Sequence, residues 1–182
     1  MKIVSLYSQK RPVLSFEVFP PKYDAPADVV VDTLEHLSGL SPDFISVTFG
    51  AGGSNQARTL EIAEIIKHRM GLEALAHLTC VCMTRQQIEK ILPSLKNIGV
   101  ENILALRGDK PKGWDCDSAF SDYLYASDLI THIKSIGGFC VGAAAYCEGH
   151  VEKDSLEEDL IFMKKKADSG ADFFITQLFL DN

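Results

Sequence analysis

Long apolar runs are missing from this sequence. The start of the chain, MKIVSLYSQKRPVLSFEVFPP, has no uninterrupted apolar stretch after its basic residues, and no later stretch is long enough to span a bilayer. We therefore expect neither a secretory signal nor a membrane helix, and we expect the protein to be cytoplasmic.

Cysteines and clustered basic residues are also scarce. The chain has five cysteines, an odd number, and most sit in apolar segments, which suits reduced thiols better than a disulfide framework. The net charge is −7, and the only basic cluster is Lys164 to Lys166. This charge pattern argues against nucleic acid or an anionic membrane as the main partner, so we expect a small-molecule ligand.

The composition that remains is typical of one globular domain covering residues 1–182, with 46% hydrophobic and 24% charged residues. Apolar, β-rich runs recur about every thirty residues, the size of a βαβ unit. Helical patterns lie between these runs, so strand and helix alternate. We predict six strands, at residues 13–18, 44–48, 74–79, 102–106, 139–144 and 173–177.

Two of the predicted helices carry start signals. Thr84 with Gln87, and Ser155 with Glu158, have the spacing of capping boxes. Pro93 lies inside the first of these helices, and a proline there should kink or break it.

Alternating strands and helices predict an α/β fold with a parallel sheet, either doubly wound or closed into a barrel. Periodicity alone does not choose between the two. If the architecture is an eight-stranded barrel, six βα units leave the chain two units short. Its edge strands would then be unpaired, and we expect such a chain to be unstable or prone to association on its own.

Polar side chains end the predicted strands. The carboxyl ends of the strands in a parallel barrel meet at one mouth, where active sites lie. We therefore expect one pocket formed by Glu17, Thr48, His77, Asp109, Tyr146 and Gln177.

Glu17 is the candidate proton donor. Side chains alternate along a strand, so Ser15 and Glu17 share one face while Phe16 and Val18 take the other. A carboxyl group flanked by apolar residues should have a raised pKa, which suits a general acid near neutral pH. A buried structural ion pair is the alternative explanation.

Two loops that follow strands could approach a ligand closely. The segment VTFGAGGS offers Gly50, Gly52 and Gly53, although such glycine-rich turns are also common without a ligand. The segment LRGDKP brings together Arg107, which could bind a phosphate or carboxylate, and Asp109, which could stabilise a cation. A salt bridge between these two residues is the alternative.

Two further clusters are weaker candidates. We do not expect zinc at His77, Cys80 and Cys82, because His77 and Cys80 face opposite sides of an extended strand and no further ligand pair is spaced nearby. The lysines at 164–166 are typical of a solvated helix face, but Lys165 or Lys166 could contact a phosphate if it reached the mouth.

Seven segments together resemble one known family. In chain order they are SFEVFPPK, FISVTFGAGGS, AHLTCV, ILALRGDKP, YASDLI, VGAAAYCEGH and ADFFITQLFLDN. This series closely resembles the methylenetetrahydrofolate reductases and covers nearly the whole chain. The resemblance implies a (βα)8 TIM barrel that binds FAD. It also implies reduction of 5,10-methylenetetrahydrofolate to 5-methyltetrahydrofolate by NADH or NADPH in a ping-pong cycle that feeds methionine synthesis, with a homo-oligomer as one option.

The same resemblance implies roles for single residues. Glu17 matches the general acid that protonates the folate, so that its five-membered ring opens to a 5-iminium cation. Asp109 matches an aspartate that steadies this cation near the flavin, and Gln177 matches a glutamine that hydrogen-bonds the pterin. The positions that match FAD contacts are Thr48, His77, Leu106, Arg107, Gly108, Asp109, Tyr125, Ala126, Tyr146, His150, Asp159, Lys165 and Lys166.

Four positions and the ending depart from the family pattern. Phe49 stands where tyrosine is common, and Cys147 and Val151 replace prolines. Phe162 stands where a polar FAD contact can occur, so it is not counted as a ligand. Family members continue past FLDN into two further βα units. The alternatives are therefore a non-catalytic fragment that retains flavin or pterin binding, and a pterin-binding barrel without redox chemistry.

Overall fold

The computed structural model describes the whole chain except residues 10, 22–27, 51–55, 110–121, 151–154 and 181–182. Six parallel strands form one sheet in the order β1-β2-β3-β4-β5-β6. All six predicted strands are confirmed, with bounds that differ by at most two residues. The strands are β1 (Ser15–Val18), β2 (Phe44–Val47), β3 (Glu73–Thr79), β4 (Asn102–Leu106), β5 (Cys140–Ala145) and β6 (Phe173–Thr176).

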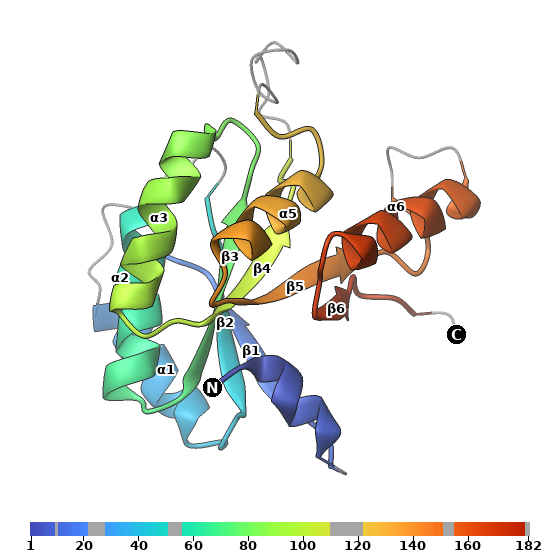
Figure 1. The fold of residues 1–182 in the computed structure, drawn as a ribbon. Coiled ribbons are helices and arrows are strands. Elements are labelled where there is room, and N and C mark those ends of the chain that lie inside the picture. The colour runs from blue at the N-terminus through green and yellow to red at the C-terminus, as the bar shows by residue number, and fades with distance from the viewer. Residues whose placement is uncertain (10, 22–27, 51–55, 110–121, 151–154, 181–182) are drawn as a thin grey trace.

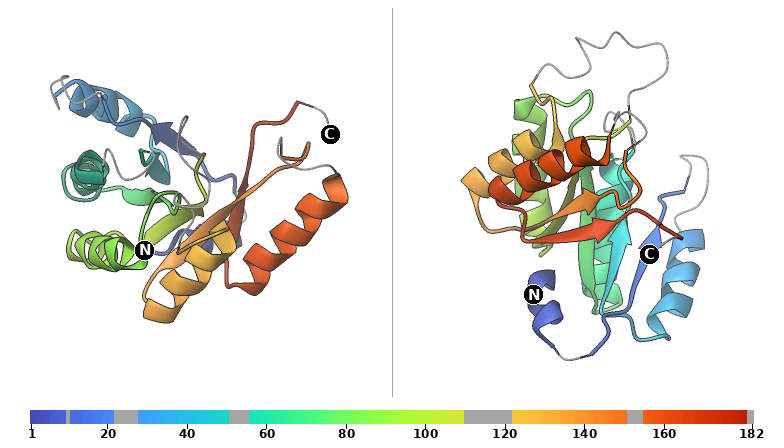
Figure 2. Two further views of the ribbon diagram at one scale, coloured as in Figure 1. Left: turned by 90° about the horizontal axis from the view of Figure 1, so that it is seen from above. Right: turned by 90° about the vertical axis from the view of Figure 1, so that its right-hand side faces the viewer.

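The α-helices of the described segments follow the convex side of a curled sheet (Figures 1 and 2). A doubly wound sheet reorders its strands and carries helices on both faces, whereas here the strand order is sequential. The fold is therefore a curled half-barrel, consistent with a TIM-like architecture. No helix in the described part of the chain is long and apolar enough to cross a membrane. The helices are α1 (Asp28–Ser38), α2 (Gln56–Glu64), which continues as a π-helical turn (Ile65–Arg69), α3 (Arg85–Asn97), α5 (Ala126–Ile136) and α6 (Leu156–Asp168).

The middle strands, β2 to β5, are buried on both faces, which explains why their sequences are nearly continuous apolar runs, whereas β1 and β6 are partly exposed. Outward-facing side chains such as Ile45, Ala76 and Ile103 pack beneath the helices and are at most 1% exposed. Inward-facing side chains near the amino ends of the strands form a separate inner cluster. The strand members of this inner cluster are Phe44, Leu75, Leu104, Cys140 and Phe173.

A short 3-10 helix, η1 (Ile3–Ser8), packs against the inner cluster. Its side chains Ile3 and Leu6 are 0% and 2% exposed. Burying two side chains of this size stabilises the fold by roughly 3 to 6 kcal/mol. The fully buried Asn102 of β4 holds the helix in place, because its Oδ1 accepts a hydrogen bond of 2.8 Å from the backbone N–H of Ile3.

Strands β5 and β6 fit together at Gly142. A β-carbon at this position would lie 2.6 Å from the ring of Phe173. Gly142 and Phe173 are direct partners in the register of the two strands. The missing side chain on β5 therefore makes the space that the aromatic ring from β6 fills.

The predicted cap of α3 is confirmed in full. The Thr84 hydroxyl accepts a hydrogen bond from the Gln87 backbone, and the Gln87 side chain accepts one of 2.7 Å from the Thr84 backbone. At the start of α6, the Ser155 hydroxyl accepts a hydrogen bond of 3.3 Å from the Glu158 backbone. Both signals thus mark true helix starts.

Pro93 does not break α3, so of the two predicted outcomes, a kink or a break, the break is wrong. The helix runs through this residue from Arg85 to Asn97. The proline is on the exposed side of the helix, where it removes one backbone hydrogen bond. The helix persists because buried side chains before and after the proline anchor both halves to the sheet, namely Ile88, Ile91, Leu92 and Leu95.

Candidate functional site

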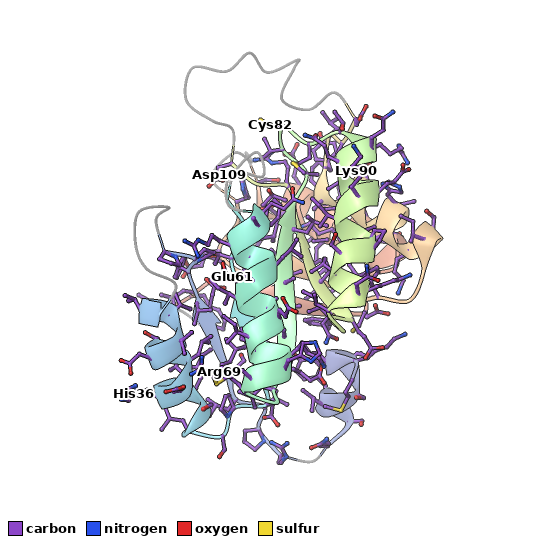
Figure 3. All side chains as sticks on the ribbon, turned by 90° about the vertical axis from the view of Figure 1, so that its left-hand side faces the viewer. His36, Glu61, Arg69, Cys82, Lys90 and Asp109 are labelled. Atoms are coloured by element: carbon purple, nitrogen blue, oxygen red, sulfur yellow. The ribbon has the colours of Figure 1, made fainter. Side chains whose placement is uncertain are left out.

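A cavity of about 410 Å³ opens at the carboxyl end of the sheet. Its lining comes from the ends of β2 to β5, the residues just after them, and helices α5 and α6. Figure 3 shows Asp109, one of the lining residues, at the same end of the molecule as Cys82, with His36 and Arg69 at the opposite end. The cavity thus lies where the strand ends converge, as the sequence predicts.

Strand β3 contributes two buried polar side chains to this cavity. His77 and Thr79 are two residues apart, so both face inward, and they are 7% and 6% exposed. Among the described residues, neither His77 Nε2 nor Thr79 Oγ1 has a hydrogen-bond partner. A buried polar atom left without a partner costs about 1 to 3 kcal/mol. A polar group that enters the cavity, or a small shift of a neighbouring polar side chain, could therefore satisfy each atom.

The loop after β4 brings its backbone close to β3. The backbone N–H of Val81 donates a hydrogen bond of 2.8 Å to the carbonyl of Arg107. The next residue, Gly108, has a φ of +84°, and a β-carbon there would lie 2.6 Å from Val81 Cγ1. Glycine is therefore required at position 108 both by backbone conformation and by space. Because Gly108 lines the cavity, a ligand can approach its backbone closely.

Two pairs of aromatic rings line the cavity. Tyr125 and Phe162 have ring centroids 4.9 Å apart, and Tyr146 and His150 have centroids 4.7 Å apart with an edge-on geometry. Tyr125 is fixed at the start of α5, because its backbone N–H donates to the Asp128 carboxylate. Aromatic faces and edges of this kind suit a flat ring system.

Lys166 brings a cation into the cavity from α6. Its Nζ donates a hydrogen bond of 2.7 Å to the carbonyl of Ala144 and lies 5.6 Å from the centroid of the Tyr146 ring. Burial lowers the pKa of Lys166, and the nearby Asp159 acts in the opposite direction. Asp159 also accepts a hydrogen bond from the backbone of His150. A lysine held in this way can bind a phosphate as a point charge.

Glu17 of β1 lies next to this cavity, beside His77. Its Oε2 is 3.4 Å from His77 Nε2, and its side chain is 47% exposed. Burial raises the pKa of Glu17, and a hydrogen bond with Ser46 opposes this shift. Burial also lowers the pKa of His77 to about 4, so the imidazole is neutral near pH 7 and the contact is not an ion pair. The raised pKa agrees with the sequence-based expectation for Glu17.

Twelve of the thirteen positions that match FAD contacts line the cavity, and the exception is Lys165. Lys165 is exposed on α6, with its Nζ 4.7 Å from the centroid of the Phe162 ring. Gln177 is also exposed and outside the lining, and its backbone N–H donates to the carbonyl of Ala145 at 2.8 Å. Gly52, Gly53 and Val151 lie outside the described residues.

Helical spacing is a signal that identifies the lining residues of α6. Asp159, Phe162, Met163 and Lys166 are spaced i, i+3, i+4 and i+7, so they share one face, while Lys165 points elsewhere. In the same way, side chains two residues apart on a strand share a face, so His77 identifies Thr79 as a second lining residue of β3. Phe162 lines the cavity although it was not counted as a ligand, and Phe49 lines it too. The other lining residues that were not expected at the site are Thr79, Ala105, Ser127, Ala144, Ala145, Leu160 and Met163.

These residues fit the flavin cofactor that the resemblance implies. The ring pairs suit a flat heteroaromatic system, and the buried Thr79 hydroxyl, which has no partner among the described residues, suits its polar edge. Gly108 permits close approach of the backbone, and Lys166 offers a cation for phosphate. The chemical character of the cavity is thus compatible with FAD.

Characterised proteins with similar sequences share one name. The chain is 41% identical over 173 residues to a 5,10-methylenetetrahydrofolate reductase of Pectobacterium carotovorum, covering 95% of this chain and 56% of that protein. It is 41% identical over 168 residues to the enzyme of the same name from Escherichia coli, covering 92% of this chain and 55% of that protein. For an Arabidopsis thaliana methylenetetrahydrofolate reductase (NADH), the identity is 38% over 192 residues, covering 99% of this chain and 32% of the relative. The chain thus spans about half the length of these bacterial relatives.

Solved structures support the fold at much lower identity. A Clostridium thermocellum protein described as binding two copies of 5-methyl-5,6,7,8-tetrahydrofolic acid has a TM-score of 0.62 and 13% identity, covering 97% of this chain and 57% of its own. A phosphoenolpyruvate phosphomutase from Streptomyces platensis has a TM-score of 0.64 and 14% identity, covering 94% of this chain and 61% of its own.

The sequence model of one family, described as methylenetetrahydrofolate reductase, matches residues 2–182. Together with 41% identity to two bacterial enzymes of that name, this match shows that the chain belongs to the methylenetetrahydrofolate reductase family.

Proposed function

We propose that this chain is the FAD-binding part of a (βα)8 enzyme that reduces 5,10-methylenetetrahydrofolate to 5-methyltetrahydrofolate with NADH or NADPH, and so feeds methionine synthesis. The observation that carries the proposal is the cavity, because twelve positions that match FAD contacts in the family line it together. Membership of the family supports the same reaction.

The residues around the cavity suggest how each part of the cofactor is held. When bound, FAD would accept a hydride from NAD(P)H and pass it to the folate. We propose that Lys166 and Arg107 bind the phosphates, since both supply positive charge to the cavity. Tyr125, Tyr146 and the backbone at Gly108, which line the cavity, would contact the flat parts of the cofactor.

Glu17 is proposed as the general acid that protonates the folate and opens its five-membered ring. Its raised pKa supports this role, because a carboxyl group that holds a proton closer to neutral pH is a better donor there. Asp109 lines the cavity and would steady the cation that results. Gln177 is proposed to hydrogen-bond the pterin.

A visible absorption spectrum of the purified chain, alone and with added FAD, tests the proposal first. We expect a yellow protein whose flavin is bleached by NAD(P)H without oxygen and recovers on adding 5,10-methylenetetrahydrofolate. A colourless protein that binds no added FAD would contradict the proposal. A yellow protein that NAD(P)H or folate does not affect would instead favour the non-catalytic alternative.

The substitution Glu17→Gln tests the proton donor. It should lower the rate of flavin reoxidation by the folate about 100-fold or more, because general acid catalysis typically contributes that much. Flavin reduction by NAD(P)H should survive, since that half-reaction needs no folate protonation. Glu64→Gln, at an exposed position of α2 away from the cavity, is the matched control and should change neither half-reaction. Equal loss of both half-reactions in Glu17→Gln would refute the assigned role.

A further inference from the structure

Glu17 of β1 and His77 of β3 meet across the interior of the curled sheet. His77 Nε2 lies 3.4 Å from Glu17 Oε2, and no other described group hydrogen-bonds this nitrogen. His77 is only 7% exposed, so its imidazole is held in place by the surrounding side chains. The Glu17 side chain is 47% exposed and has room to adjust. A shift of a few tenths of an ångström by Glu17 would bring the two atoms within normal hydrogen-bond distance.

The protonation states decide which atom donates. Burial lowers the pKa of His77 to about 4, so near pH 7 the ring is neutral and carries a single N–H. Burial raises the pKa of Glu17, and a hydrogen bond with the Ser46 side chain lowers it in part. A neutral imidazole with its proton on Nε2 can donate to Oε2 whether the carboxyl group is ionised or protonated, because each form retains an acceptor oxygen.

We propose that His77 is a positioning residue for Glu17, with Nε2–H donating to Oε2 so that the acidic proton is carried by Oε1. Fixing one oxygen as an acceptor removes the rotation that would otherwise exchange the two oxygens. The proton is then presented from one oxygen in one direction, which is the pre-organisation that proton transfer requires. This role rests on the proposed function of Glu17 as the general acid, and it gives His77 a task beyond contact with the cofactor.

A double-mutant cycle in the folate half-reaction separates this role from simple filling of space. His77→Leu removes the donor and should slow flavin reoxidation by the folate about 10- to 100-fold, the size expected for a misplaced catalytic group. In a Glu17→Gln background, the same substitution should have less than about a threefold further effect, because the group that His77 positions is already gone. His77→Gln, whose side-chain amide can donate from a similar position, should recover most of the rate. Additive effects of the two substitutions would overturn the proposal, as would equal defects in His77→Gln and His77→Leu.

A second measurement does not depend on the flavin or on turnover. The imidazole ¹⁵N resonances of His77 in the cofactor-free chain should report the Nε2–H tautomer, and Glu17→Gln should shift the Nε2 signal. Observation of the Nδ1–H tautomer, or an unchanged Nε2 signal in Glu17→Gln, would refute the hydrogen bond. If the wild-type chain instead shows this coupling but no folate-dependent reoxidation, the proposed function fails while the hydrogen bond stands.

Discussion

Acid should destabilise the fold through one buried side chain, His77. Its ordinary pKa of 6.5 falls to about 4 in the folded chain because burial disfavours the charged ring. The folded state therefore binds fewer protons than the unfolded state between these two values, and stability is lost as the pH falls through that window. Well above pH 6.5 the ring is neutral in both states, so none of this stability is lost there.

The size of this effect follows from the two pKa values. A difference of one pKa unit corresponds to about 1.4 kcal/mol of stability. The fall in the pKa of His77 from 6.5 to about 4 therefore corresponds to about 3 kcal/mol, which is lost in full once the pH is below both values. Between pH 7 and pH 5.5, the linkage relation gives a loss of about 1 kcal/mol from this residue alone. That loss is a sizeable fraction of a net stability of about 5 to 15 kcal/mol.

Urea unfolding of the wild type and of His77→Gln at a series of pH values tests the reasoning. Glutamine does not titrate, so the free energy of unfolding of the wild type should fall relative to the variant by about 1 kcal/mol from pH 7 to pH 5.5. Carboxylates that do not contact position 77 titrate alike in both proteins, so their contributions cancel in the difference. Glu17 contacts His77 and would not cancel, so both proteins carry Glu17→Gln in this measurement. Two free-energy curves that stay parallel over this range would show that His77 is not held neutral by burial.

Three other substitutions probe the packing of the interior by urea unfolding. Gly142→Ala should destabilise the fold by about 1 to 3 kcal/mol, because its methyl group would meet the Phe173 ring at 2.6 Å, and an unchanged midpoint would contradict this packing. Asn102→Leu should cost about 1 to 3 kcal/mol by leaving the buried N–H of Ile3 without an acceptor, and a neutral result would mean that water replaces the amide. Thr79→Val should leave the stability of the cofactor-free chain unchanged or raise it by about 1 kcal/mol, because it removes a buried hydroxyl without a partner, and a large loss would reveal a hidden partner.

The strands could be predicted well because the physics that forms them is local. A strand buried on both faces is mostly apolar, as in β2 with the sequence FISV and β4 with NILAL, each of which has a single polar residue. Of the six polar residues expected to form one pocket, four line the cavity, whereas Glu17 and Gln177 lie outside its lining. The same local reasoning failed at Pro93, because the packing of its helix against the sheet outweighs the loss of one hydrogen bond.

Contacts across the interior could not be predicted in the same way. Glu17 and His77 belong to strands that are not neighbours, and they meet only because the sheet curls. The helix η1 was also not predicted, because Ile3 and Leu6 show no strand or long-helix pattern. They are buried against inward-facing side chains near the amino ends of strands that are distant in the sequence. In contrast, the choice between Lys165 and Lys166 follows from helix geometry once one residue of the lining face is known.

The fit between Gly142 and Phe173 has a consequence for how this sequence can change over time. A larger residue at Gly142 costs stability unless position 173 becomes smaller, because the two side chains share one space. Gly142→Ala together with Phe173→Leu should therefore destabilise the fold by less than the sum of the two single substitutions. In related proteins, a larger residue at one of these two positions should go with a smaller residue at the other.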